Sequence, residues 1–267
     1  MAEERGVAAS LRVYLRAYSA SLQAKLEYRT DLAIGLVTSM MLQAAGLSLL
    51  WIVLRVAPSL NGWTAPQVLY LFGMTAACLG GSELFFNQIW SLPGAIVMGD
   101  LDRLLTYPVR ALPFFLLTRP ELHAFGNVLT GFSYVTASLL WLSAPWYVWL
   151  AAPLLWLCGM LVYTAVLVWF GCLSFRVLGP QLSSMMVAHN LLQATRYPLG
   201  AYPRGVRFAL LFLFPFGAFH YVPGSIFFGH GAPLIGLVGA PLAALVTMWL
   251  AQRAWDLGLA SYESTGS

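Results

Sequence analysis

Two long runs without Asp, Glu, Lys or Arg limit what this chain can fold into. One extends from Leu122 to Phe175 over 54 residues, and the other from Phe208 to Gln252 over 45 residues. An α-helix needs about 20 apolar residues to cross the hydrocarbon core of a bilayer, so the first run is long enough for two crossings. Hydrophobic residues make up 60% of the chain and charged residues only 9%, which is outside the range of soluble domains. The sequence therefore predicts an all-α integral membrane protein.

Six membrane spans are predicted within a single domain of residues 1–267. Residues 1–31 precede the first span, and the bundle occupies residues 32–267. Proline is expected to interrupt a helix because it lacks an N–H group and clashes with the preceding turn. The predicted spans are, in chain order, Leu32–Leu54, Val68–Trp90, two within Leu122–Phe175 divided at Pro145 and Pro153, Gly179–Thr195, and Leu234–Leu250.

The basic residues indicate how the chain is oriented, because Lys and Arg concentrate in cytoplasmic loops. The two short loops near Asn61 and Pro145 contain none. Both loops are therefore placed outside, and both chain termini in the cytoplasm. Three arginines, Arg196, Arg204 and Arg207, fall on the outer side and are the exception. The ten basic residues placed inside are Arg5, Arg12, Arg16, Lys25, Arg29, Arg103, Arg110, Arg119, Arg176 and Arg253.

The N-terminal segment has the pattern of a helix that lies in the membrane interface. An apolar stripe and a polar stripe recur at helical spacing on opposite sides, which would hold the basic side chains near anionic lipid. An ordinary solvated helix is the alternative. The apolar stripe comprises Leu11, Leu15, Tyr18, Leu22 and Leu26, and the polar stripe comprises Arg12, Arg16, Ser19, Gln23 and Glu27.

The sequence contains no motif for catalysis, for a cofactor or for a metal ion. Its one lysine, Lys25, has no glycine-rich loop around it, which excludes a phosphate-binding loop of the GxxxxGK[ST] type. The four histidines share no metal-ligand spacing, and the three cysteines lie unpaired in apolar tracts. The net charge of +4 is interpreted as membrane orientation rather than as affinity for nucleic acid. We therefore expect a transport protein and not an enzyme.

Charge is concentrated in the short stretch GDLDRLLTYPVRAL, residues 99–112. A helix here has acidic residues at its start, where the helix dipole is positive, and a basic residue at its other end. Its leucines recur at helical spacing and can face the bundle, which leaves the charges for a soluble partner. A surface loop is the alternative. The charged residues are Asp100, Asp102, Arg103 and Arg110, and the leucines are Leu101, Leu104, Leu105 and Leu112.

Four stretches of the chain carry a resemblance to a known family. They are YRTDLAIGLV before the first span, IVMGDLDRLLTYPVRAL after the second, ATRYPLGAYPRGVRFALLFLFPFGAFHYVPGSIFFG before the last, and LGLASYESTGS at the end. The arrangement resembles the permease subunit of type-2 ATP-binding-cassette exporters, and among these a bacterial subfamily of paired permeases. The resemblance implies that residues 99–112 form a coupling helix that docks on a separate ATPase subunit.

The resemblance further implies an ATP-driven exporter of two permease and two ATPase subunits in the bacterial inner membrane. The second permease would be a non-identical homologue or a second copy of this chain. ATP and Mg²⁺ would bind to the ATPase subunits, so this chain would hold no cofactor. Membrane lipid would surround the permeases.

An outer re-entrant hairpin before the last span is also implied by the resemblance. Pro215 and Pro223 would break this hairpin, and the three outer arginines would lie among the outer headgroups. A rival topology makes residues 179–206 a cytoplasmic helix and Phe208–Phe228 the fifth span. The rival topology agrees better with the distribution of charge.

Two other function classes are open at this stage. Glu83 is the one charge in the second predicted span, and a carboxylate inside a bilayer usually has a partner or lines water. It would suit a secondary transporter driven by an ion gradient, although proton coupling usually recruits several titratable groups. A structural role for Glu83 is the alternative. The second class is a membrane-embedded lipid-modifying enzyme, for which no residue marks a nucleophile.

Overall fold

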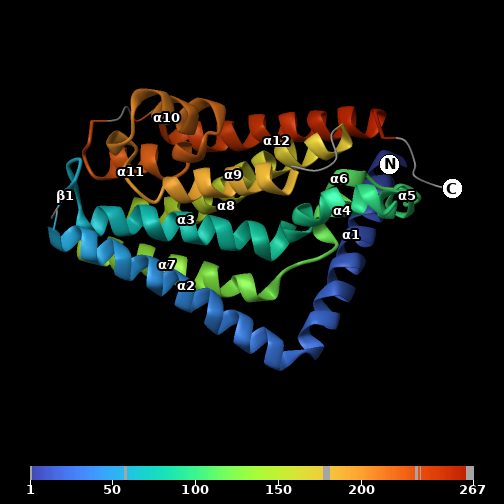
Figure 1. The fold of residues 1–267 in the computed structure, drawn as a ribbon, viewed down its shortest axis with the longest axis horizontal. Coiled ribbons are helices and arrows are strands. Elements are labelled where there is room, and N and C mark those ends of the chain that lie inside the picture. The colour runs from blue at the N-terminus through green and yellow to red at the C-terminus, as the bar shows by residue number, and fades with distance from the viewer. Residues whose placement is uncertain (1, 57–58, 177–180, 232–233, 235, 263–267) are drawn as a thin grey trace.

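The computed structural model describes residues 2–56, 59–176, 181–231, 234 and 236–262. For residues 2–11 and 181–183 it describes the helix but not the side chains. The regular secondary structure of the described residues is helical apart from one hairpin of two-residue strands (Figure 1). The α-helices are α1 (Ala2–Glu27), α2 (Arg29–Val56), α3 (Ala65–Phe86), α4 (Leu92–Val97), α5 (Asp100–Leu105), α6 (Ala111–Leu117), α7 (Phe125–Trp141), α8 (Trp146–Gly171), α9 (Gln181–Ala194), α10 (Arg204–Phe208), α11 (Tyr221–Phe227) and α12 (Gly236–Ala260).

Short turns and one hairpin connect these helices. The strands β1 (Ser59–Leu60) and β2 (Trp63–Thr64) pair antiparallel, with Ser59 opposite Thr64. The 3₁₀ turns are η1 (Asn87–Ser91), η2 (Leu122–Ala124), η3 (Cys172–Phe175), η4 (Leu199–Ala201) and η6 (Phe216–Ala218), and η5 (Ala209–Leu213) is a π-helical turn.

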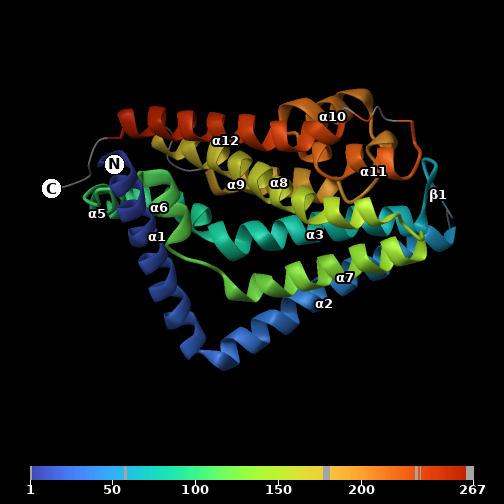
Figure 2. The same cartoon turned by 180° about the vertical axis from the view of Figure 1, so that it is seen from behind.

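The long helices lie side by side in layers (Figures 1 and 2). Across the bundle, α2 and α7 come first, then α3, then α8 and α9, and finally α12. One end of the bundle holds α4, α5, α6 and the N-terminus of α1, and we name it the α5 end. The opposite end holds the strand hairpin, α10 and α11, and we name it the β1 end.

Among the described residues, four helical stretches are long and apolar enough to cross a bilayer, namely Arg29–Val56, Ala65–Val97, Trp146–Phe175 and Gly236–Ala260. The bent pair Arg204–Leu213 and Phe216–Phe227 would count as a fifth if it formed one span. Helices α7 and α9 lie in the same bundle but have only 17 and 14 residues. The prediction of a helical, multi-pass membrane protein is therefore confirmed.

The interior of the bundle is formed by its two central long helices. Burial covers 78% of the apolar window of Ala65–Val97 and 67% of that of Trp146–Phe175. The values for α2 and α12 are only 17% and 22%. These two outer helices therefore expose large apolar side chains, among them Leu42, Trp51, Leu245 and Trp249, as expected of surfaces that face lipid or another membrane subunit.

Helices α3 and α7 touch through their backbones because both have glycine at the crossing. A Cβ atom on Gly131 would lie 2.7 Å from the carbonyl oxygen of Gly73 and would also clash with the backbone of Ala77. One turn further along α3, a Cβ on Gly80 would lie 2.7 Å from the backbone nitrogen of Val128. Small residues four apart allow such close contact in membranes, where dispersion and polar contacts hold helices together.

The prolines that were predicted to divide helices have two different outcomes. Pro145 precedes α8 and separates it from α7. Pro153 lies inside α8, so the predicted break at this residue is wrong. A proline at this position costs one backbone bond, from the carbonyl of Trp149, and membrane helices tolerate that loss. Pro223 is the third residue of α11, where an N–H group needs no partner within the helix, so it does not break the helix either.

The segment between α9 and α12 is bent at Pro215. Its two helical parts, Arg204–Leu213 and Phe216–Phe227, meet at an angle of 79°. The chain enters this segment from α9 and leaves it into α12 at the β1 end (Figure 1). The rival topology makes residues 179–206 a cytoplasmic helix. Within this range, α9 packs one side against the bundle through the buried residues Met185, Ala188 and Leu192.

Helix α1 meets α2 in a sharp corner at Tyr28 and runs across the α5 end of the bundle (Figure 2). Of the predicted apolar stripe, Tyr18 and Leu22 are half-buried against the protein, whereas Leu15 and Leu26 are exposed. The side chain of Leu11 lies outside the described residues. One part of the apolar stripe thus packs against the protein, and the other part is exposed.

The backbone contact of α3 with α7 generates a prediction. Gly131→Ala should destabilise the protein by about 1–3 kcal/mol, the usual cost of overpacking, because the added methyl group forces two backbones apart. Thermal unfolding in detergent, followed by tryptophan fluorescence, measures the effect. Gly94→Ala is the matched control, since a Cβ there meets no atom within 4 Å. Equal unfolding temperatures for the two variants would contradict the described contact.

Candidate functional site

The short helix α5 is set at one end of the bundle by its flanking residues. Gly99 precedes it with φ of +73°, a conformation that favours glycine and lets the chain turn sharply after α4. Asp100 and Asp102 lie in the first turn of α5, where acidic side chains interact favourably with the helix dipole. Leu101 is fully buried and fixes α5 against the bundle.

The predicted single helix over residues 99–112 is divided. Helix α5 ends at Leu105, and α6 begins at Ala111. The reason is Pro108, which disfavours helical backbone at the preceding residue. Arg110 consequently lies at the N-terminus of α6 and not at the C-terminus of the acidic helix, so the predicted dipole role of Arg110 is wrong.

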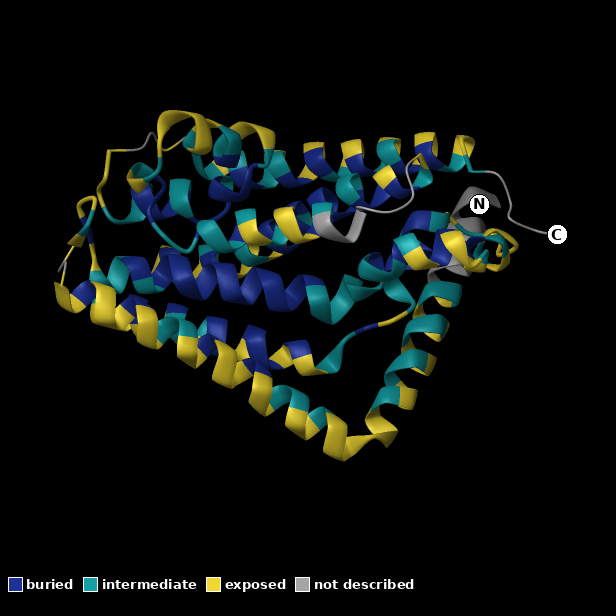
Figure 3. Ribbon diagram, viewed as in Figure 1, coloured by how far each residue is buried: buried dark blue, intermediate teal, exposed yellow. Residues whose placement is uncertain are grey.

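Several exposed side chains surround α5 (Figure 3). Charged and apolar side chains alternate on this surface, and Leu104 beside them is half-buried. A surface of mixed charge and apolar character at the end of a bundle is suited to contact a soluble protein. We name it the α5 surface, and it comprises Val97, Met98, Asp100, Arg103, Leu105 and Tyr107.

A polar hollow adjoins the α5 surface. It has a volume of about 610 Å³ and lies between α1, α5 and α6. Its polar lining residues include Ser21, Asp100, Arg103, Thr118 and Arg119. The charges that the sequence placed on one helix are therefore joined by the charge of Arg119, which follows α6, and by the hydroxyl groups of Ser21 on α1 and Thr118 after α6.

Asp102 faces a different neighbour from Asp100 and Arg103. It is half-buried, and its carboxylate lies near the hydroxyl of Tyr262, just after α12. Burial, with a further contribution from Asp102, raises the pKa of Tyr262 above its usual value of 10.0. The ring of Tyr262 packs edge-on against Phe175 at 6.1 Å. The end of α12 is thus in contact with the environment of α5, while residues 263–267 of the final matching stretch lie outside the described residues.

Three polar contacts of described α1 side chains attach this helix to the same end. The hydroxyl of Tyr14 donates a hydrogen bond of 3.4 Å to the carbonyl of Arg110. The hydroxyl of Ser21 donates one of 2.6 Å to the carbonyl of Thr118. Lys25 forms an ion pair of 2.5 Å with Glu121. Through these contacts, α1 is held against α6 and the segment that follows it.

Glu121 is the centre of a charged cluster that joins three parts of the chain. Its carboxylate lies 3.0 Å from Nδ1 of His123 and accepts a hydrogen bond of 3.4 Å from Asn87. The contact with His123, and then that with Lys25, lowers the pKa of Glu121 to about 2. The same contact with Glu121 raises the pKa of His123 above 6.5.

Glu83 has a polar partner inside the bundle. The amide of Asn127 on α7 donates a hydrogen bond of 3.1 Å to the Glu83 carboxylate on α3. Asn127 in turn accepts a hydrogen bond of 3.0 Å from Gln43 on α2. The carboxylate that the sequence singled out is therefore bonded to a neighbouring helix.

The three arginines expected at the outer headgroups do not lie together. Arg204 is exposed at the start of α10, and Arg207 is half-buried. The guanidinium of Arg196 points into the bundle, where it lies 4.4 Å from the ring centroid of Phe72 and donates a hydrogen bond of 3.0 Å to Gln43. The headgroup placement predicted for Arg196 is corrected by these contacts.

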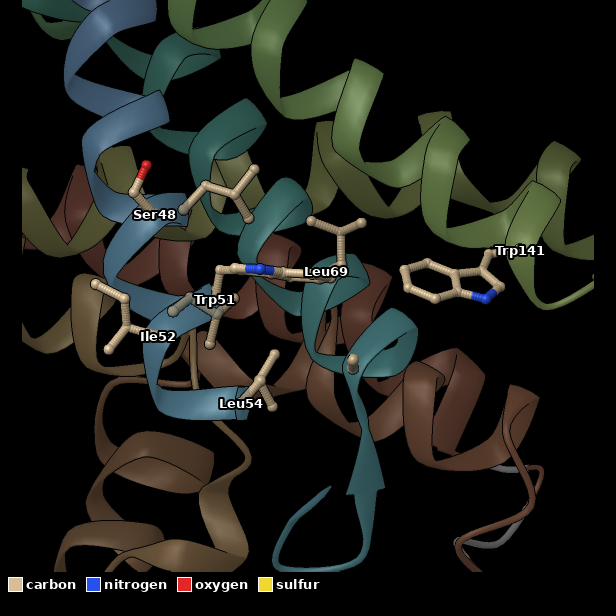
Figure 4. A pocket seen from close by; sticks show the side chains of 9 residues that line it. Ser48, Trp51, Ile52, Leu54, Leu69 and Trp141 are labelled. Atoms are coloured by element: carbon tan, nitrogen blue, oxygen red, sulfur yellow. The ribbon is translucent and has the colours of Figure 1, made fainter. Parts of the chain in front are cut away.

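An apolar cavity of about 410 Å³ lies between α2, α3 and α7 (Figure 4). Trp51 on α2 and Trp141 on α7 flank Leu69 on α3, and Ser48 is the one polar side chain in the lining. Such a lining offers no titratable group for catalysis. The cavity therefore belongs to the apolar surface of the bundle.

A comparison with protein families decides what kind of protein this is. The family model described as ABC-2 family transporter protein matches residues 40–266. The chain belongs to the ABC-2 family of transporter proteins. No curated protein and no solved structure matches it.

Membership in the ABC-2 transporter family assigns the chain to the membrane part of a transporter. The family implies that such a membrane protein works with an ATP-binding subunit. The matched range includes α5, α6, the bent segment and α12, but begins after α1 and within α2. In this ABC-2 transporter the α5 surface is therefore part of the region that the family model covers.

The sequence interpretation missed two functional candidates in this ABC-2 transporter, Gln43 and Asn127. Both are neutral, so neither interrupted the uncharged spans from which the helices were predicted. Both are nevertheless almost completely buried, at 4% and 8% exposed. An amide inside an apolar span is expected to find a partner, and that expectation could have identified both residues.

The Glu121 cluster generates a pH prediction. A carboxyl with a lowered pKa stabilises the fold above its unfolded value of 4.5 and loses that effect as the pH falls toward 2. His123, with a raised pKa, contributes below 6.5 and loses its effect as the pH rises through its higher folded pKa. Glu121→Gln should therefore lower the unfolding temperature by about 1–3 °C, with the largest difference between about pH 4.5 and 6.5.

Thermal unfolding of the ABC-2 transporter in detergent, from pH 3 to 9 (a range set by the pKa values above), measures this difference. Glu27→Gln is the matched control, because Glu27 is exposed on α1, the helix that also carries Lys25. A difference between wild type and Glu121→Gln that does not change with pH would contradict the described cluster.

Proposed function

We propose that this chain is the transmembrane subunit of an ATP-driven exporter in a bacterial inner membrane. A separate ATPase subunit would dock on the α5 surface, and ATP with Mg²⁺ would bind to that subunit. The observation that carries the proposal is the α5 surface itself, on which exposed Asp100 and Arg103 stand among exposed apolar side chains in an ABC-2 family chain.

The anchoring of α5 supports a coupling role. Its buried residue Leu101 packs in the same hydrophobic core as Leu92 and Ile96 of α4, and α4 continues from α3 through η1. A force on the α5 surface is thereby transmitted to α3, the most buried span. The neighbouring α6 carries the bonds to α1, which offers a second route into the membrane through α2.

We further propose six crossings with both termini in the cytoplasm. The crossings are the four long stretches together with α7 and α9, and Arg204–Phe227 forms an outer re-entrant hairpin. This topology places the α5 end inside and the β1 end outside, with α1 in the cytoplasmic interface. A helix of 17 residues such as α7 is about 26 Å long, close to the thickness of the hydrocarbon core.

Two permeases and two ATPase subunits would form the complete exporter. The second permease would be a non-identical homologue or another copy of this chain. Both would alternate between inward-facing and outward-facing arrangements as the ATPase subunits close on ATP. The exposed faces of α2 and α12 supply the membrane-facing surface on which lipid and a second permease can pack.

Docking on the α5 surface predicts the effect of charge reversal. Asp100→Arg and Arg103→Glu should each reduce association with the co-expressed ATPase subunit by about tenfold or more, as expected for charges at an interface. Copurification and the ATPase activity of the complex measure the effect. Arg204→Glu is the matched control, because Arg204 is exposed at the opposite end. Wild-type association of both α5 variants would refute the docking role.

The proposed topology predicts which residues react from outside the cell. With Cys78, Cys158 and Cys172 replaced by serine, a cysteine at exposed Ala201 should react in intact cells with a membrane-impermeant thiol reagent. A cysteine at Asn61 is the external control, and one at Thr106 is the internal control; both positions are exposed. Labelling of position 201 only after permeabilisation would rule out the outer hairpin.

A further inference from the structure

Four buried or half-buried polar side chains form one continuous chain of hydrogen bonds across the bundle. Nη2 of Arg196 donates to Oε1 of Gln43 at 3.0 Å, and Nε2 of Gln43 donates to Oδ1 of Asn127 at 3.0 Å. Nδ2 of Asn127 donates to Oε2 of Glu83 at 3.1 Å. We name these four residues the polar relay. They come from four places in the chain: the turn after α9, α2, α7 and α3.

The chemistry of its two ends fixes the direction of the polar relay. A guanidinium can only donate and an ionised carboxylate can only accept. Gln43 must therefore present its oxygen to Arg196, and Asn127 must present its nitrogen to Glu83. This leaves the nitrogen of Gln43 to bond the oxygen of Asn127, as observed. Every bond in the chain thus points from the positive end to the negative end, an arrangement in which neighbouring bonds strengthen one another.

The polar relay also explains how Arg196 is accommodated. No carboxylate lies within 4.0 Å of its guanidinium in the part of the chain that the structure describes, and its Nε atom is buried without a hydrogen-bond partner. Phe72 contacts the guanidinium from one side. Gly46 makes room for it, because a Cβ there would lie 3.3 Å from Nη1 of Arg196. The carboxyl group of Glu83 lies at the far end of the relay, two amides away from Arg196.

Gln43 is the central contact of α2 with the rest of the bundle. The buried residues of α2 are Ser39, Gln43, Leu50 and Leu54, so Gln43 is one of two in the first two-thirds of the helix. The preceding helix α1 is bonded to Arg110, Thr118 and Glu121 near the α5 surface. Only Tyr28 separates α1 from α2. The α1–α2 arm, residues 2–56, therefore connects the α5 end to the polar relay.

We propose that the polar relay positions the α1–α2 arm during transport, with Gln43 as the positioning residue through which nucleotide-driven movement at the α5 end reaches Arg196 and Glu83. This role rests on the proposed function, because it assigns a task to the relay within the ATP-driven cycle. The existence of the relay as one electrostatic unit is independent of that function.

A double-mutant cycle tests the relay in the purified permease alone. Arg196→Gln and Glu83→Gln each change one end of the same hydrogen-bonded chain, so the double variant should unfold at a temperature at least about 3 °C above the additive expectation. The Gln43→Met substitution keeps the side-chain length but removes both hydrogen bonds of the Gln43 amide. In this background the excess over the additive unfolding temperature should disappear. Additive effects in both backgrounds would overturn the relay. If Arg196→Gln does not fold, the cycle is run with Asn127→Leu in place of that variant, and non-additivity with Glu83→Gln is again expected.

Spin labels test the positioning role in the complex with the ATPase subunit. With the native cysteines replaced, labels at exposed Met41 on α2 and exposed Met186 on α9 report the separation of the two helices. In wild type this distance should change between the nucleotide-free and the ATP-trapped complex. In Gln43→Met the change should be lost while ATP hydrolysis persists, and in the control Ser48→Ala it should persist. An unchanged response in Gln43→Met would overturn the positioning role.

The two tests separate the relay from the proposed function. If the wild-type permease did not associate with an ATPase subunit, or if their complex did not hydrolyse ATP, the proposal of an exporter would be wrong. The double-mutant cycle would still decide whether the relay exists. An active complex with additive double variants would count against the relay alone.

Discussion

The backbone contact between α3 and α7 is the interaction on which the rest of the structure depends. Gly73 and Gly131 allow the two helices to approach until main-chain atoms touch. The approach brings Asn127 beside Gly80 and within bonding distance of Glu83. Helix α2 then packs on α7, where Gly126 faces the carbonyl of Leu36. Without the two glycines, the amide of Asn127 could not bond to α2 and α3 together. These two glycines, which have no side chain, therefore determine where the polar groups of the interior meet.

Much of the fold could be predicted from the sequence, because hydropathy reports directly on membrane insertion. The uncharged tracts around Leu32–Leu54 and Leu234–Leu250 appear as α2 and α12. Proline was less informative, since its effect depends on where in a helix it falls. Pro145 directly precedes a helix, whereas Pro153 and Pro223 lie within helices. The folding of Arg196 into the bundle was not predictable, because its partners come from α2 and α3, far away in the chain.

The candidate site was predictable to a similar extent. The charged stretch does form an exposed helix with buried Leu101, since alternation of charge and leucine is a local property. The ion pair of Lys25 with Glu121 joins residues that are 96 positions apart, and no local pattern indicates it. The role of Gln43 and Asn127 was not predicted for a different reason. Charged residues interrupt an apolar stretch in a hydropathy profile, whereas a single neutral amide does not.

The corner at Tyr28 has a consequence for the protein in its membrane. The uncharged part of helix α2, Leu32–Leu54, has 23 residues and is about 35 Å long, whereas a typical hydrocarbon core is about 30 Å thick. A tilt accommodates the excess length, and α2 runs oblique to α3 (Figure 1). Its tilt cannot vary freely, because α1 is held at one end and Gln43 in the middle. Hydrophobic mismatch with a thinner or thicker bilayer is therefore converted into strain at these two attachments, so that the lipid itself acts on the geometry of the polar interior.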